Sequence, residues 1–290
     1  MMFMELFLIL NLLFGVLFIT LMERKFLSIM NFRKGPNFFF INSLFQSLMD
    51  FLKLIFKMMM KMNFTFKIMW IIMIFFGLIL FFIIIFNYPF LNSFLFIYNN
   101  FFMMFLIYSM MAFFFLLLSL SSNSVYSLMA MHRVLIQIIS YEMGLIFLFI
   151  FPLIIMNFFN FFFFYLMKNT FFSITLMYLY VLLLMALSEL NRTPFDFLES
   201  ETELVSGFNV EYFSSLFSMI FLIEYGYFIF MILLLNFFLY LSLMLLMLMY
   251  MFMIWLRAFL PRLRYDKMLY LFWKDFMLLI MTMYTMLILI

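Results

Sequence analysis

The sequence predicts an all-α integral membrane protein with eight transmembrane helices and one amphipathic helix at the membrane interface. Of its 290 residues, 70% are hydrophobic and 10% are charged, whereas a soluble domain has about 45–50% apolar and about 25% charged residues. The mean hydropathy is +1.26. Long apolar runs recur at the length of about 20 residues that a bilayer-spanning helix requires. We expect one membrane domain over residues 1–290, because no long polar segment could fold separately.

Eight apolar segments are long enough to span a bilayer: 3–22, 68–87, 101–121, 135–156, 171–190, 214–235, 237–256 and 273–290. Asn236 is the main polar interruption between the sixth and seventh segments, so this hairpin must be tight. The first segment is followed by the charged residues "ERK" without a small-residue cleavage site, which predicts a retained helix. The loops expected on one side are 23–67, 122–134, 191–213 and 257–272.

The amino-acid usage points to an organellar gene. Phe and Met are very abundant, with 53 and 35 copies, while there are only 6 Gly and 5 Pro. Residues with A/T-rich codons dominate, and so much Met would follow if ATA were read as Met, as in animal mitochondria. Single Phe and Met residues are therefore uninformative, and the surviving polar residues carry more information.

The distribution of basic residues predicts the orientation. Every Lys and Arg except Lys168 lies in or beside an odd-numbered connection of the eight-helix arrangement. Positive residues mark the side from which membrane helices are inserted. We expect this basic side to face the mitochondrial matrix, with both termini in the intermembrane space of the inner membrane.

The first connection contains a predicted amphipathic helix. Its sequence is "NSLFQSLMDFLKLIFK", residues 42–57. One stripe at helical spacing is polar: Ser43, Gln46, Ser47, Asp50, Lys53 and Lys57. The other face is Leu, Phe, Met and Ile, which predicts a helix lying in the interface. Packing against a partner subunit is an alternative, and both can hold.

Composition also excludes several kinds of site. The chain has no cysteine, so disulfides and Cys-ligated metal or iron–sulfur sites are excluded. His132 is the only histidine, which excludes bis-His haem ligation within the chain. We expect no metal site, and any electron carrier belongs to a partner. Gly35 and Pro36 indicate a turn, not a phosphate-binding loop.

Three carboxylates fall inside or at the edge of apolar segments: Glu142, Glu189 and Glu224. A carboxylate within a membrane is costly and by default indicates an ion or proton pathway. The alternative is a structural acid paired with a neighbouring Arg, Lys or Tyr. Tyr141 and Tyr225 adjoin two of these acids in sequence but, as helix neighbours, should point elsewhere.

Acidic residues gather in one further stretch, "SELNRTPFDFLESETELVSGFNVEY", residues 188–212. By the orientation above it lies on the matrix side, where the other connections are basic. Opposite charges predict that it folds against those connections, and Arg24, Arg33 and Arg262 are plausible partners. The alternative is a solvated acidic loop.

Several motifs together resemble the chain 1 family of NADH–ubiquinone oxidoreductases, the mitochondrially encoded subunit of respiratory complex I. They are "ERKFLSIMNFRKGPN", "QIISYEMGL", the acidic stretch, "FLIEY" and "WLRAFLPRLRYDKMLYLFWKDF". They occur in the family's order from about residue 20 to 277. The resemblance implies an eight-helix subunit whose matrix loops help to build a ubiquinone tunnel and whose acids lead toward proton channels.

The resemblance also implies roles for individual residues. A proton-path and coupling role falls on Glu142, Glu189, Glu224, Asp196, Glu199, Glu201, Glu203 and Glu211. A quinone-binding role falls on Arg24, Arg33, Arg257, Arg262, Arg264 and Phe208. The chain departs from the family with "FFFIN" after "RKGPN", with "SELNRTPFD" and with Ser200, but the charged positions are intact.

We therefore expect a core subunit of proton-pumping NADH:ubiquinone oxidoreductase that is not catalytic alone. Ubiquinone would be the substrate, and FMN and iron–sulfur clusters would lie in partner subunits. The expected partners are peripheral-arm quinone-module subunits, neighbouring membrane-arm subunits and lipids such as cardiolipin, with no nucleic acid. The residues alone also allow two other functions: a stand-alone ion transporter, or a structural anchor for a peripheral arm.

Overall fold

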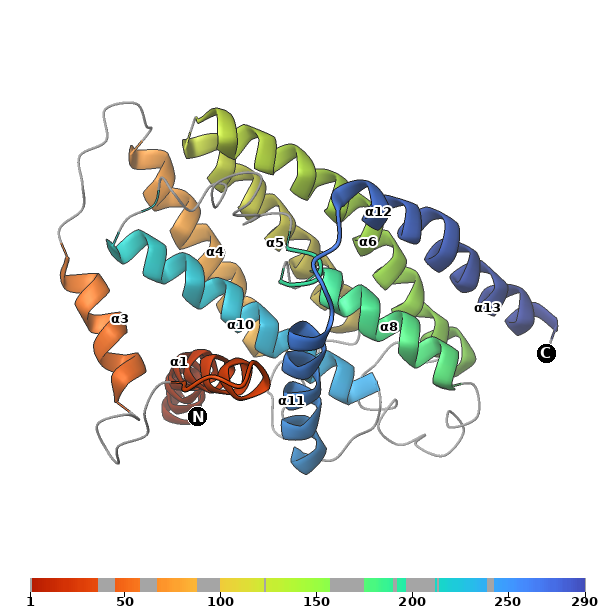
Figure 1. Ribbon diagram of the computed structural model, residues 1–290, viewed down its shortest axis with the longest axis horizontal. Coiled ribbons are helices and arrows are strands. Elements are labelled where there is room, and N and C mark those ends of the chain that lie inside the picture. Colours follow the sequence, from red (N-terminus) through yellow and green to blue (C-terminus); the bar gives the residue numbers. More distant parts are fainter. Residues whose placement is uncertain are drawn as a thin grey trace.

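The computed structural model describes residues 2–35, 45–57, 67–87, 100–122, 124–156, 175–189, 192–196, 212, 214–238 and 243–289. The regular secondary structure in these ranges is helical, without strands, as predicted. The helices, labelled in Figure 1, are α1 (Met2–Met30), α3 (Gln46–Phe56), α4 (Lys67–Asn87), α5 (Asn100–Ser122), α6 (Val125–Met156), α8 (Thr175–Glu189), α10 (Ser214–Phe238), α11 (Leu243–Phe259), α12 (Tyr265–Tyr270) and α13 (Met277–Leu289). A π-helical turn, Leu271–Phe276, joins α12 to α13.

Two helical stretches in the described part are long and apolar enough to cross a membrane, Val125–Ile154 and Ser214–Asn236. Shorter apolar stretches lie at Met69–Ile83, Phe113–Ser122 and Met247–Phe259. These assignments rest on length and composition alone. The fold is thus compatible with membrane spans, and the count of eight stays a prediction.

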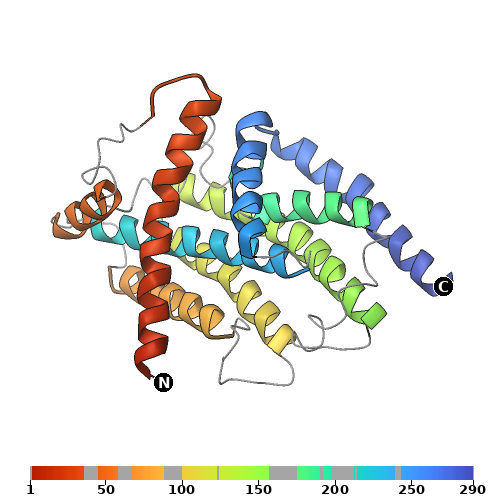
Figure 2. The same ribbon diagram turned by 90° about the horizontal axis from the view of Figure 1, so that it is seen from below.

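Helix α10 is the centre of the arrangement. It contacts α1, α3, α4 and α11, while α6 contacts α5, α8, α12 and α13. In Figure 2, α1 crosses α10 and runs alongside α11, and the two chain ends lie far apart. Most described side chains of α10 are buried, including Ile220, Ile223 and Met231 at 0% exposure. The helix that provides much of the candidate site is therefore held on several sides.

Two glycines allow α4 to approach its neighbours closely. A Cβ at Gly226 of α10 would lie 2.1 Å from the Phe81 ring of α4, and a Cβ at Gly77 of α4 would lie 2.5 Å from the Phe114 ring of α5. Small residues at helix contacts permit this close packing, which stabilises helix pairs where water supplies no driving force. The aromatic rings that fill these gaps are themselves buried.

Helix α3 forms within the segment predicted to be an amphipathic helix. It packs against α1 and α10 at the edge of the bundle (Figure 1). Ser47 of its polar stripe is buried, whereas Met49 and Phe56 are 64% and 81% exposed. Its polar face is therefore directed partly inward, and the placement of its apolar face in a membrane interface stays a prediction.

Candidate functional site

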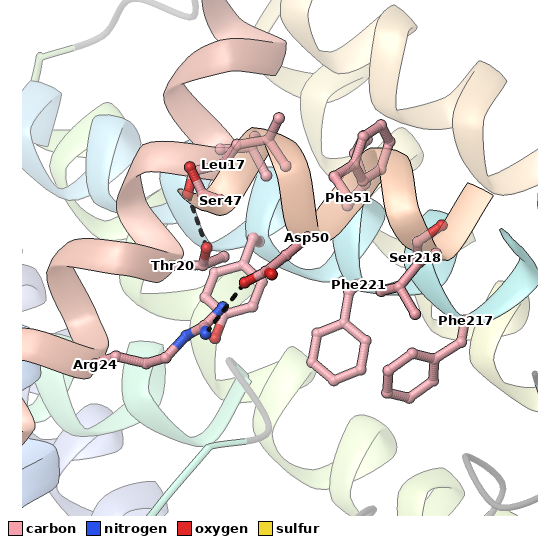
Figure 3. Close-up of a pocket in the computed structure, with 13 residues that line it drawn as sticks. Leu17, Thr20, Arg24, Ser47, Asp50, Phe51, Phe217, Ser218 and Phe221 are labelled. Atoms are coloured by element: carbon pink, nitrogen blue, oxygen red, sulfur yellow. Dashed lines mark hydrogen bonds and ion pairs between the residues drawn. The ribbon is translucent and has the colours of Figure 1, made fainter. Parts of the chain in front are cut away.

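A cavity of about 350 Å³ lies between α1, α3 and α10 (Figure 3). Its wall is mostly apolar, with a few hydroxyl groups and one pair of opposite charges. The lining residues are Val16, Leu17, Thr20, Arg24, Ser47, Asp50, Phe51, Leu54, Phe217, Ser218, Phe221, Leu222 and Tyr225. Ligand sites in proteins share this character of an apolar slot with a few polar groups.

The charged pair in the wall joins α1 to α3. Arg24 Nη1 lies 3.9 Å from Asp50 Oδ2, and Figure 3 shows the two side chains directed at one another. Their side chains are 58% and 50% exposed. Water therefore reaches this part of the cavity, and the ion pair alone adds little stability.

Aromatic rings form one wall of the cavity. Phe217, Phe221 and Tyr225 are spaced four residues apart on α10 and all line the cavity. Side chains at this spacing stand one above the other on a helix. The ring centres of Phe217 and Phe221 are 4.4 Å apart, and those of Phe221 and Tyr225 are 6.2 Å apart. This wall offers flat apolar surfaces to a planar ring.

A buried ion pair lies beside the inner part of this wall. Arg257 of α11 donates to Glu23 of α1, and the side chains are 8% and 7% exposed. Both groups lie close enough to Tyr225 to act on it electrostatically. Tyr250 of α11 also donates a hydrogen bond to the backbone carbonyl of Ile19, at 3.0 Å. Two polar contacts therefore join α1 to α11.

Glu23 was not predicted as a site residue. The first predicted span ends at residue 22, so Glu23 was expected in a loop, but α1 continues to Met30. The helix thus carries Glu23 into the bundle instead of to the surface. The signal available in the sequence was the carboxylate directly after an apolar run, in "ERK".

A second ion pair fixes Glu224. Arg192 Nη2 donates to Glu224 Oε2 at 3.0 Å, and the side chains are 15% and 13% exposed. Glu224 was expected either to belong to a proton path or to pair with a neighbouring basic or tyrosine residue, and the structure shows a pair with Arg192. The guanidinium carbon of Arg192 also lies 5.0 Å from the centre of the Tyr225 ring. Tyr225 thus shares Arg192 as a neighbour with Glu224, and its expected direction away from this acid stays a prediction.

A third pair joins the start of the acidic stretch to the connection between α11 and α12. Arg262 Nη2 donates to Asp196 Oδ2 at 2.5 Å, and the Leu263 amide donates to the Pro194 carbonyl at 3.0 Å. The expectation that the acidic stretch folds against a basic connection is thus confirmed at Asp196. Of the three arginines expected as partners of the acidic stretch, Arg262 contacts it. Arg24 pairs with Asp50 instead, and Arg33 is exposed after the end of α1.

Glu142 lies apart from these pairs. It is half-buried on α6 and forms no ion pair within the described ranges. Tyr141 points away from it, as predicted, and donates to the Met268 carbonyl at 3.1 Å. The Tyr141 ring lies between Phe195 and Phe272, with centres 5.7 and 4.9 Å away. The aromatic cluster in this part of α6 is therefore built around Tyr141.

The remaining predicted site residues are distributed as follows. Arg264 lies 3.7 Å from Asp266, and both side chains are more than three-quarters exposed, so this arginine is not brought to the cavity. Glu189 is the last residue of α8, but its side chain lies outside the described residues. So do Glu199, Glu201, Glu203, Phe208 and Glu211.

Comparison with known proteins gives the family. The sequence matches the family described as NADH dehydrogenase over residues 4–289. It is 36% identical over 281 residues to NADH-ubiquinone oxidoreductase chain 1 of Apis mellifera ligustica, covering 93% of this chain and 90% of the relative. The Rhipicephalus sanguineus protein of the same name is 38% identical over 279 residues, covering 92% and 87%. That of Didelphis virginiana is 32% identical over 291 residues, covering 93% and 90%.

This chain belongs to the NADH-ubiquinone oxidoreductase chain 1 family. The resemblance inferred from the motifs is therefore confirmed, and the chain is a subunit of an enzyme complex. In this family member, two of the acids predicted from the motifs, Asp196 and Glu224, are paired with arginines. The cavity adds an aromatic wall beside the Glu224 pair.

Proposed function

We propose that this chain forms the membrane part of a ubiquinone tunnel in proton-pumping NADH:ubiquinone oxidoreductase and links quinone reduction to proton translocation. The observation that carries the proposal is the cavity between α1, α3 and α10, with its aromatic wall beside two buried ion pairs. The family's name, NADH-ubiquinone oxidoreductase chain 1, supports ubiquinone as the substrate.

The chemistry of ubiquinone fits this cavity. A quinone ring is flat and carries two carbonyl oxygens, and its tail is apolar. The rings of Phe221 and Tyr225 can stack on it, and Arg24 can donate a hydrogen bond to a carbonyl oxygen. Val16, Leu17 and Leu54 give the tail an apolar path. We keep the quinone-binding role predicted for Arg257, which lies beside Tyr225. Arg33, Arg262, Arg264 and Phe208 stay predicted contacts elsewhere along the tunnel.

Reduction of the quinone takes up two electrons and two protons and yields the quinol. The electrons come from partner subunits that hold FMN and iron–sulfur clusters. A charge that develops in the cavity lies near ion pairs that water screens poorly, so it alters the electrostatic energy of their carboxylates strongly. This change is the link that we propose between the redox reaction and the acids.

The proposed proton path consists of the carboxylates predicted from the motifs. They are Glu142, Glu189, Glu224, Asp196, Glu199, Glu201, Glu203 and Glu211. Glu142, half-buried and without a paired base within the described ranges, is the member best suited to change its protonation state.

We place the chain in the inner mitochondrial membrane with eight spans, α3 in the matrix-side interface and both termini in the intermembrane space. The distribution of Lys and Arg supports this orientation. The exposed apolar residues of α3, such as Phe56, support contact with lipid or with a partner subunit. The partners are quinone-module and membrane-arm subunits and lipids such as cardiolipin.

The test is photoaffinity labelling of native membranes with an azido-ubiquinone, followed by mapping of the labelled peptides. We expect label in 16–24, 47–54 or 217–225, displaced by excess ubiquinone. A matched control uses an azido-alkane with the same tail and no quinone ring, which should label these peptides weakly. Label found only on other subunits would reduce the chain to a structural anchor or a proton path.

A further inference from the structure

Arg192 connects the wall of the cavity to Glu224. Its Nη2 donates to Glu224 Oε2 at 3.0 Å, and its guanidinium carbon lies 5.0 Å from the Tyr225 ring centre and 5.7 Å from that of Phe221. Both rings line the cavity, whereas Arg192 and Glu224 do not. We propose that Arg192 is a positioning residue that transmits the occupancy of the cavity to the carboxylate of Glu224. The inference rests on the proposed binding of quinone in this cavity.

The arrangement depends on the spacing of three residues on one helix. Phe221 and Tyr225 are four residues apart on α10, and Glu224 is three residues after Phe221, so all three project within about one turn. Arg192 comes from the connection after α8 and meets them from outside the helix. One cation therefore contacts two lining rings and one carboxylate at the same time.

Arginine suits this position and lysine does not. A guanidinium is planar, so its face can lie over aromatic rings while its edge donates to a carboxylate. A lysine ammonium is a compact charge that can satisfy Glu224 but offers no flat face to the rings. Lysine at position 192 should thus keep the charge balance at Glu224 and lose the contact with Phe221 and Tyr225.

The contact with the rings makes the ion pair sensitive to the cavity. The side chains of Arg192 and Glu224 are 15% and 13% exposed, so little water is present to replace a lost hydrogen bond. A flat molecule that packs against Phe221 and Tyr225 shifts these rings. The guanidinium then follows the rings or loses contact with them, and in both cases its geometry toward Glu224 Oε2 changes.

The test uses the complete complex and a short-tailed ubiquinone as the probe. Infrared difference spectra, recorded with and without the probe, report changes in carboxylate hydrogen bonding. In the native complex we expect a carboxylate band that disappears in the Glu224→Gln variant. In Arg192→Lys the band should be lost and kcat should fall. The KM for the probe should stay within about twofold of the native value, because binding itself is not impaired.

A second variant and a matched control accompany this measurement. Phe221→Leu removes one of the two rings while Arg192 and Glu224 keep their ion pair, and it should also weaken the carboxylate band. Arg133→Lys is the control, because Arg133 on α6 lies 5.9 Å from the Tyr265 ring centre and does not line the cavity. That variant should keep both the band and the turnover.

The outcomes separate the inference from the function on which it rests. A full carboxylate band and unchanged kcat in Arg192→Lys would overturn the role of Arg192. The role of Arg192 would also be overturned if the native complex shows no Glu224-dependent band although azido-ubiquinone labels peptide 217–225. If instead the azido-ubiquinone never labels the cavity peptides, the proposed function itself fails.

Discussion

Removing the charge of Glu23 should destabilise the contact between α1 and α11 by several kcal/mol. In the structure Glu23 and Arg257 are 7% and 8% exposed, so water cannot solvate an arginine left behind by Glu23→Gln. Breaking a buried pair on one side costs about 3–5 kcal/mol. We expect a cost at the lower end of this range, about 3 kcal/mol. The native pair is incompletely hydrogen-bonded, because Glu23 Oε2 and Arg257 Nε have no hydrogen-bond partner among the described residues, so less is lost when it is broken. This cost corresponds to roughly a hundredfold change in an equilibrium constant.

The assay is the amount of assembled complex on native gels after heating over a range of temperatures, which does not depend on quinone turnover. Glu23→Gln should lower the midpoint temperature and the amount assembled. Asp266→Asn is the matched control, because the Arg264–Asp266 pair is more than three-quarters exposed and such pairs contribute less than about 1 kcal/mol. The double variant Glu23→Gln, Arg257→Met removes the stranded charge and should recover much of the loss.

Two results would refute this reasoning. A midpoint in Glu23→Gln equal to that of Asp266→Asn would mean that the Glu23–Arg257 pair is solvated in the assembled complex. A double variant that is as unstable as, or less stable than, Glu23→Gln alone would mean that the stranded arginine is not the cause of the loss.

Three further predictions follow from named contacts. Glu142→Gln should lower proton pumping per electron while the complex still assembles, measured by pH-sensitive dyes in vesicles; unchanged pumping would remove Glu142 from the path. Gly226→Leu should lower the heating midpoint by overpacking, at a cost of about 1–3 kcal/mol, because its Cβ would lie 2.1 Å from the Phe81 ring, and adding Phe81→Ala should restore it in part. Arg262→Gln should speed proteolytic cleavage near Asp196 relative to Arg264→Gln, since Arg262 pairs with Asp196 and Arg264 pairs with Asp266 instead; equal cleavage of both would contradict this role.

The sequence determined the class of the protein and much of its local structure. Apolar runs of bilayer length predicted helices, and helices are what the described part contains. The stripe in residues 42–57 predicted the amphipathic helix that forms at Gln46–Phe56. Opposite charges in two connections predicted that they meet, as Asp196 and Arg262 do. All of these follow from local periodicity or from the sign of a charge.

Only the tertiary structure decided which charge meets which. Glu23 and Arg257 are 234 positions apart, and no local pattern pairs them. Glu224 could have been a free relay or a paired acid, and the position of Arg192 after α8 settled that it is paired. The cavity likewise exists because α1, α3 and α10 meet, each contributing one wall. Helix periodicity fixes which face a residue occupies, but the partner of that face depends on the packing of the whole chain.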